Sequence, residues 1–277
     1  MQSIKFLPLV LVPFLAFAAC SGDDKGGDAG GDAGGDVANS DAPVDGFHQT
    51  GQIVDYSSGA GLGGATITGG GSTTQGDSKG NYDLVVPKNT PYSMTTSLDG
   101  YLTLHEQEWQ LSADSVRGKT SAVANGTEQL LKSILQPQPD PTLGVLTIQV
   151  IATGGDAGGC ASATGATISV PGLAVDGGTG AHLVYFDGGS PNLPSASATS
   201  VTDGALPSAI IYDLPIGMFS SVTVTHPTCS TVPFPVADPN IPTLTYTGKV
   251  DVEASSVAVD DAGTMGNVAS FMRVFLK

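Results

Sequence analysis

Short stretches of alternating apolar and polar residues recur along much of the chain. In the clearest of them, Tyr82, Leu84 and Val86 alternate with more polar or smaller residues. Alternation with a period of two is typical of a strand with one buried face. Turn-forming runs such as 76–80 separate these stretches, so residues 47–112 are expected to form an antiparallel β-sandwich.

The same kind of pattern returns in the C-terminal half. Leu146 and Ile148 alternate with polar neighbours, and the run 165–170 repeats the order of small and β-branched residues found at 64–68. These features predict a second, diverged β-sandwich over 144–277, with extra strands near its end. The expected fold class is therefore all-β, with two tandem antiparallel β-sandwich domains of the transthyretin (prealbumin) type.

Residues 113–143 differ from both predicted sandwiches and are expected to link them. The run 127–135 has the composition of a short helix, with Asn125 or Thr127 as its cap. Prolines within 137–141 then stiffen the connector. We expect the domain boundary here.

The N-terminal segment carries a localisation signal. A single lysine precedes an apolar run at 6–19, which ends in Ala18-Ala19-Cys20. The run is shorter than the roughly 20 residues that a membrane-spanning helix needs. This arrangement resembles a bacterial lipoprotein signal peptide (1–19), in which Cys20 receives the lipid. An ordinary secretory signal is the alternative, because Phe17 replaces the more usual leucine.

Residues 20–46 are expected to be a disordered acidic tether. Glycine and aspartate repeat every four residues over 26–36 and offer nothing to bury. Calcium-binding Gly/Asp repeats have a period of about nine residues and a regular apolar position. This run has neither, so calcium binding is not expected.

Residues 47 to about 104 contain a series of short motifs in a fixed order, namely Gly51 with Val54-Asp55, Gly64-Ala65-Thr66-Ile67, Thr74 with Asp77, Gly80-Asn81-Tyr82-Asp83-Leu84, Val86-Pro87, Tyr92 and Gly100-Tyr101. This series resembles the carboxypeptidase regulatory-like domain, a small transthyretin-like sandwich. The resemblance implies a structural or binding module that is attached to no single activity.

Charge and cysteine content narrow the function classes. The net charge is −16, from 26 acidic and 10 basic residues, so the chain repels phosphate backbones and nucleic-acid binding is not expected.

If Cys20 carries lipid, Cys160 and Cys229 remain as a pair in an exported protein. A disulfide between them is the natural expectation.

Two glycine motifs look catalytic but predict turns. The run 59–64 satisfies G-x-G-x-x-G, and the run 76–80 satisfies the nucleophile motif G-x-S-x-G around Ser78. A dinucleotide site and a nucleophile elbow both require a helix directly after the motif. Here a strand is expected after each, so neither cofactor binding nor a catalytic serine is predicted.

His105 and Glu108 form an H-x-x-E pair, the zinc-binding pair of the metallocarboxypeptidases after which the resembling domain is named. Zinc would need a third ligand, for which His182 and His226 are the downstream histidines. Trp109 occupies the position of the second histidine in an H-E-x-x-H motif. We therefore expect no catalytic residue, metal or cofactor, although a zinc hydrolase stays as a minor alternative.

The sequence predicts a non-enzymatic structural or binding lipoprotein of the bacterial cell surface, serving adhesion or scaffolding. Its expected partners are the membrane, through the lipid on Cys20, and an unidentified surface protein or glycan. Ser21 follows the cysteine instead of aspartate, which by resemblance favours the outer membrane. The alternative is a carbohydrate-binding module, for which Tyr101, Trp109, Tyr185 and Phe186 are the candidate aromatic residues.

Overall fold

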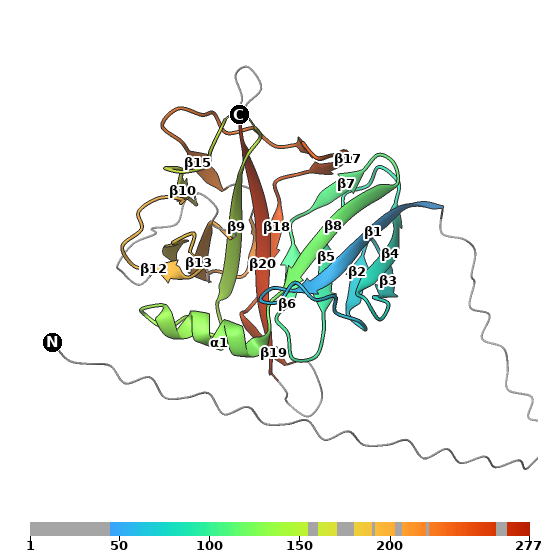
Figure 1. Cartoon of the computed structure of the whole chain (residues 1–277), viewed down its shortest axis with the longest axis horizontal. Coiled ribbons are helices and arrows are strands. Elements are labelled where there is room, and N and C mark those ends of the chain that lie inside the picture. The colour runs from blue at the N-terminus through green and yellow to red at the C-terminus, as the bar shows by residue number, and fades with distance from the viewer. Residues whose placement is uncertain are drawn as a thin grey trace, which may run out of the picture. The chain divides into compact units, whose positions relative to one another are not determined.

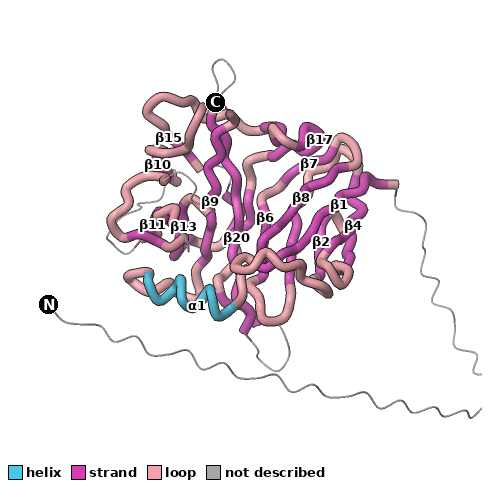
Figure 2. Tube along the Cα trace, in the orientation of Figure 1, coloured by secondary structure: helices cyan, strands magenta, loops and turns pink. Residues whose placement is uncertain are grey.

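β-Strands dominate the computed structural model, which describes residues 45–154, 160–170, 180–189, 192–202, 207–219, 222–258 and 265–277. Within these residues the one helix is α1 (Asn125–Ile134), drawn in cyan among the magenta strands of Figure 2. The expectation of an all-β fold class is confirmed. The expected signal peptide, Cys20 and the tether up to residue 44 lie outside the described residues.

Ten strands form the largest sheet, in the order β12-β11-β13-β9-β20-β6-β5-β2-β3, with β19 paired to β20. Their bounds are β2 (Thr66–Gly69), β3 (Ser72–Gln75), β5 (Met94–Ser97), β6 (Thr103–Glu106), β9 (Gly144–Ala152), β11 (His182–Phe186), β12 (Pro194–Ser195), β13 (Ala209–Leu214), β19 (Ser256–Ala258) and β20 (Met265–Leu276). The central strand β20 runs parallel to both β9 and β6 (Figure 1). Parallel neighbours need long connections, and here most of the chain separates β6 from β20.

A three-stranded sheet, β4-β1-β8, packs beside the large one. Strand β1 (Gly46–Asp55) pairs antiparallel with β4 (Asn81–Pro87) and parallel with β8 (Ser115–Ala122). The remaining strands form small sheets: β10 (Thr167–Ser169) with β15 (Thr223–Thr225), β14 (Gly217–Phe219) with β18 (Val250–Val252), and β17 (Ile241–Tyr246) between β16 (Val236–Asp238) and β7 (Trp109–Leu111).

The two tandem, purely antiparallel domains expected at 47–112 and 144–277 are not confirmed. Strand β20 lies between β9 and β6, and β17 pairs with β7, so strands from both ranges share sheets. Strand β8, which falls inside the expected linker 113–143, pairs with β1. The segment Pro43–Lys277 therefore forms one compact unit. Alternation shows which face of a strand is buried, but it does not select the strand's partners.

The core of the N-terminal part contains side chains from the end of the chain. Trp109, Tyr246 and Phe275 are completely or almost completely buried in one cluster. The ring centroids of Trp109 and Tyr246 are 5.8 Å apart, and those of Tyr246 and Phe275 are 5.5 Å apart. Because such aromatic contacts contribute beyond the area they bury, this core needs β17 and β20 to be complete.

The expected disulfide is confirmed. Cys160 and Cys229 are bonded, with Cα atoms 5.5 Å apart. Cys160 precedes β10 and Cys229 follows β15, and these two strands pair antiparallel. The bond thus joins neighbouring strand ends beside the cluster that contains Leu146, Ile148 and Met272.

Local predictions agree well with the structure. Helix α1 occupies most of the run expected to be helical, although its N-cap is Ala124 and not Asn125 or Thr127. The run around Ser78 is a turn, in which the Asp77 side chain accepts hydrogen bonds from the backbone of Lys79 (2.8 Å) and Asn81 (2.9 Å). Among the described residues, no helix has the length and apolar character needed to cross a bilayer.

Candidate functional site

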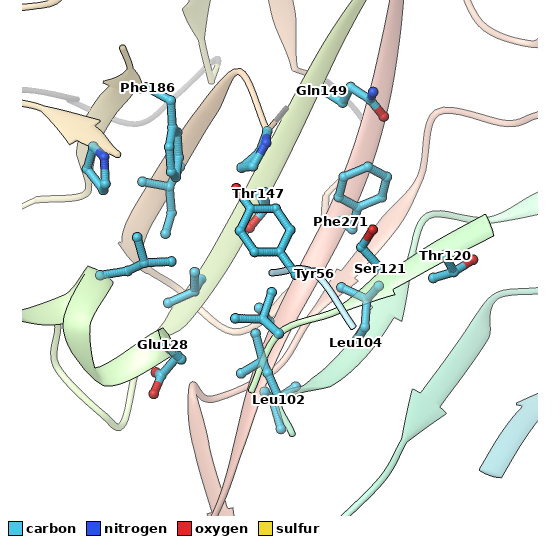
Figure 3. Close-up of a pocket in the computed structure, with 18 of the residues that line it drawn as sticks. Tyr56, Leu102, Leu104, Thr120, Ser121, Glu128, Thr147, Gln149, Phe186 and Phe271 are labelled. Carbon is cyan, nitrogen blue, oxygen red and sulfur yellow. The ribbon is translucent and has the colours of Figure 1, made fainter. Parts of the chain in front are cut away.

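A cavity of about 460 Å³ lies between one face of the large sheet and the segment formed by β8 and α1. Figure 3 labels Thr147 and Gln149 from β9, Phe271 from β20, Leu104 from β6 and Ser121 from β8 among the residues that line it. Its volume lies within the range of small-molecule sites. It is the candidate functional site.

The alternation of the strands explains why this sheet face is available. On β9, Leu146 and Ile148 are buried in the core cluster that lies beside the disulfide, so Thr147 and Gln149 point to the opposite face of the sheet. On β20, Met272 likewise points into that core. The sheet therefore buries one face in a packed core and directs the other at the cavity.

One end of the cavity is apolar. Helix α1 and its C-cap contribute Leu131 and Leu135, and the sheet contributes Leu102, Leu104 and Val145. On the same helix, Leu130 and Ile134 are exposed, whereas Glu128 is buried. Figure 3 shows Leu102 at the end near the helix and Gln149 at the other.

The other end is polar and carries Arg117, Gln149 and Arg273. Arg273 donates from Nε to Gln149 Oε1 (3.1 Å) and from Nη1 to the hydroxyl of Tyr246 (2.7 Å). The Tyr246 hydroxyl donates in turn to Asp238 (3.1 Å). The same Arg117, Gln149 and Arg273 also border a second, more open and more polar hollow of about 560 Å³.

A buried ion pair fixes this polar end. The guanidinium of Arg117 on β8 binds both carboxylate oxygens of Glu106 on β6, with Nη1 at 2.5 Å from Oε1, and each side chain is 2% exposed. The guanidinium also lies 4.3 Å from the centroid of the Trp109 ring, a cation–π distance. The pair therefore ties the small sheet to the large one.

Burial and charge set the protonation states here. Burial is the largest single effect on the pKa of Arg117 and would lower it, but the Glu106 carboxylate together with Tyr82 and Tyr246 outweighs burial, so the pKa lies above its ordinary value. Burial raises the pKa of Tyr246 to about 12, against the opposing effect of Arg273. The pKa of Tyr92 also rises on burial. These phenols are therefore neutral at physiological pH, and Arg117 is charged.

An irregularity in β8 places a lysine beside this arginine. The pairing of β1 with β8 shifts register between Thr50 and Gln52, and Gly118 has φ +83°. In a regular strand Lys119 would share the inward face of Arg117. Because of the extra residue, Arg117 is buried whereas Lys119 is exposed, and both line the cavity.

The aromatic residues proposed for glycan binding do not form a sugar platform. Trp109 is completely buried and Tyr185 is 5% exposed, so neither presents its ring to a ligand. Tyr101 is half-buried, and its hydroxyl donates to Asp55 Oδ2 (3.2 Å), which holds the loop after β1. The prediction that these residues form a ligand-binding site is therefore wrong. Trp109 and Tyr185 pack in the protein core instead, because burial removes their apolar surface from water.

His105 and Glu108 do not converge on a metal site. His105 lies 3.5 Å from Glu253, whereas Glu108 accepts a hydrogen bond from Thr247 (2.7 Å). Among the described residues, the grouping with metal-ligand geometry is instead Cys160, His226 and Cys229. The two sulfurs there are joined in the disulfide, so the group does not offer two thiolates.

Of the residues that line the cavity, only Phe186 was among the sequence-predicted candidates, as a possible sugar-binding aromatic residue, and it is 2% exposed. The alternation at 146–150 did indicate that Thr147 and Gln149 share one face. It did not indicate that β8 and α1 would cover that face, because this depends on pairing between distant segments. Arg117 carried no signal, since the inward positions of β8 include the polar residues Ser115 and Thr120.

Comparisons with known proteins give few relatives. No family model matches the chain, and no curated protein matches its sequence. Among solved structures, a Bacteroides fragilis protein of unknown function matches 29% of the chain at 23% identity and a TM-score of 0.23. The Bacillus anthracis TIE protein and a streptococcal ancillary pilin each match 83% of the chain, at 11% and 10% identity and TM-scores of 0.24 and 0.23.

The chain spans only part of these proteins, covering 28%, 34% and 62% of their respective lengths. Likenesses at such TM-scores do not indicate a shared function.

Proposed function

We propose that this chain is a lipid-anchored protein of the bacterial cell envelope whose β-rich unit is a non-enzymatic binding module. In this proposal, Cys20 carries the lipid, the acidic segment after it spaces the folded unit from the bilayer, and the cavity between β8, α1 and the large sheet takes a small apolar molecule. The single observation that carries the binding role is this cavity, because it is concave, largely apolar and bordered by a few fixed polar groups.

The chemistry of the lining supports binding over catalysis. The hydroxyl groups of Thr120, Ser121 and Thr147 border the cavity, but none of the chain's four histidines lies in its lining. The histidines are engaged elsewhere; for example, His226 bonds the backbone oxygen of Thr164 (2.8 Å) and His182 lies 3.7 Å from Asp213. The described lining therefore lacks the serine–histidine pairing that activates a hydroxyl nucleophile in many hydrolases.

Filling the cavity should abolish binding. In the variant Thr147→Phe, the larger side chain would occupy the middle of the cavity, while phenylalanine remains well suited to a strand. We expect affinity for a neutral apolar dye such as N-phenylnaphthylamine to fall at least about tenfold, equivalent to about 1.4 kcal/mol. Fluorescence titration of the purified β-rich unit measures this.

The matched control is Thr68→Phe, the same change at an exposed position of β2 in the same sheet. It should bind the dye like the unmodified protein. Equal binding by both variants, or no dye binding by the unmodified protein, would contradict the proposed cavity.

Lipid anchoring is tested separately on the natively expressed chain. The mature protein should show a lipid-sized mass increment and partition with membranes, and Cys20→Ala should lose both properties. Intact-mass analysis and membrane fractionation provide the measurement. Recovery of an unlipidated, freely soluble mature protein would contradict the anchor and leave a secreted binding protein.

A further inference from the structure

We infer that the cavity takes a single-chain anionic amphiphile, with its hydrocarbon chain toward α1 and its carboxylate beside Arg273 and Lys119. This inference rests on the proposed binding function and specifies the ligand class. It is carried by two observations: the charge of the lining and the order of apolar and polar groups along it.

The charge of the lining is opposite to that of the chain. The sequence contains 26 acidic and 10 basic residues. Of the residues that line the cavity, four are basic (Arg117, Lys119, Lys132 and Arg273) and only Glu128 is acidic. A surface with random composition would show the reverse excess, so the lining favours an anionic ligand.

Two of these cations are available to a ligand. Arg117 is neutralised by Glu106, and Lys132 forms an ion pair with Glu128. Arg273 lies 3.9 Å from Asp238, and no described residue bonds its Nη2 atom, while its side chain is 20% exposed. Lys119 is exposed, and none of the ion pairs found among the described residues includes it. The second Arg273 nitrogen and the Lys119 ammonium can therefore both donate to a carboxylate.

The strand register orders the groups along the cavity. Parallel pairing places Arg273 beside Gln149 and Phe271 beside Thr147. The same strand pairs Ala269 with Leu104 of β6, closer to the end occupied by Leu102 and α1. Apolar groups near α1 therefore give way, at the other end, to an amide and a guanidinium that lie side by side, which matches a molecule with an apolar tail and an anionic head. Figure 3 shows Leu102 and Gln149 at these two ends.

The test compares three twelve-carbon amphiphiles, each below its micelle concentration, as competitors of the neutral dye on the unmodified protein. Dodecanoate should compete at least about tenfold more tightly than dodecanol, because charge-assisted hydrogen bonds are stronger than neutral ones. Dodecylammonium should compete most weakly. The preference for dodecanoate should narrow as ionic strength rises.

Matched lysine variants test the head-group position. Lys119→Gln should weaken dodecanoate about two- to fivefold and leave dodecanol unchanged, since the site keeps Arg273. Lys79→Gln removes the same charge from an exposed turn outside the cavity lining, and both ligands should then bind as before.

The outcomes separate the two proposals. Equal competition by all three amphiphiles, or tightest competition by dodecylammonium, would overturn the anionic ligand while leaving an apolar binding cavity. Failure of the dye and of every amphiphile to bind would overturn the binding function itself.

Discussion

Replacing Arg117 by methionine should lower the free energy of unfolding by about 3–5 kcal/mol. The change removes one partner of a fully buried ion pair and leaves the Glu106 carboxylate in a site where it is 2% exposed. It also removes the cation above the Trp109 ring. Trp109 is the only tryptophan of the chain, so its fluorescence in a urea titration reports directly on this region.

The double variant Arg117→Met with Glu106→Leu is the decisive control. Removing both charges avoids the unpaired carboxylate, so most of the lost stability should return. Lys249→Met breaks the exposed contact with Glu108 (3.7 Å) and should cost no more than about 1 kcal/mol. A cost below about 1 kcal/mol for Arg117→Met, or no recovery in the double variant, would contradict the role assigned to this pair.

Removing the disulfide should cost about 4 kcal/mol, because the bond closes a loop with a sequence separation of 69 residues and so restricts the unfolded chain. The double variant Cys160→Ala with Cys229→Ala should therefore unfold at a clearly lower urea concentration. The effect is expected mainly in the core around Leu146 and Met272, next to which the bond lies. Reduction of the unmodified protein should shift the urea midpoint in the same direction.

The double cysteine variant also provides the control for reduction. Dithiothreitol should have no further effect on its urea midpoint, because no bond remains to be broken in the folded unit. If reduction leaves the unmodified protein as stable as before, the bond does not contribute to folding. The loop-closure argument would then be wrong for this chain.

Patterns that act over a few residues predicted local structure correctly. The alternation around Leu146 and Ile148 identified β9 and its core face, and the run before Leu135 identified α1. Two remaining cysteines, together with the expectation of an exported chain, were enough to predict their bond. The predictions of β9 and α1 depend only on the order of residues within one strand or a few helical turns. The prediction of the disulfide depends only on the number of cysteines and the expected oxidising compartment.

Patterns could not assign partners to the strands. The strand near the C-terminus was expected as an addition to a second sandwich, yet β20 lies at the centre of the large sheet and contributes Phe275 to the first core. Strand β8 was missed because its inward positions include Ser115 and Arg117, which break the apolar alternation. Residues that are buried through a long-range ion pair leave no periodic apolar signal.

The sequence alone was sufficient to predict the all-β class, the positions of many strands and the disulfide, and its prediction of an N-terminal signal segment stays a prediction. The tertiary structure alone decided that one unit forms instead of two, that Trp109 and Tyr185 pack in cores, and that Thr147, Gln149 and Arg273 border a cavity. The physical reason is that side-chain period is a local property of a strand, whereas the surface that covers each face is selected by contacts between distant segments.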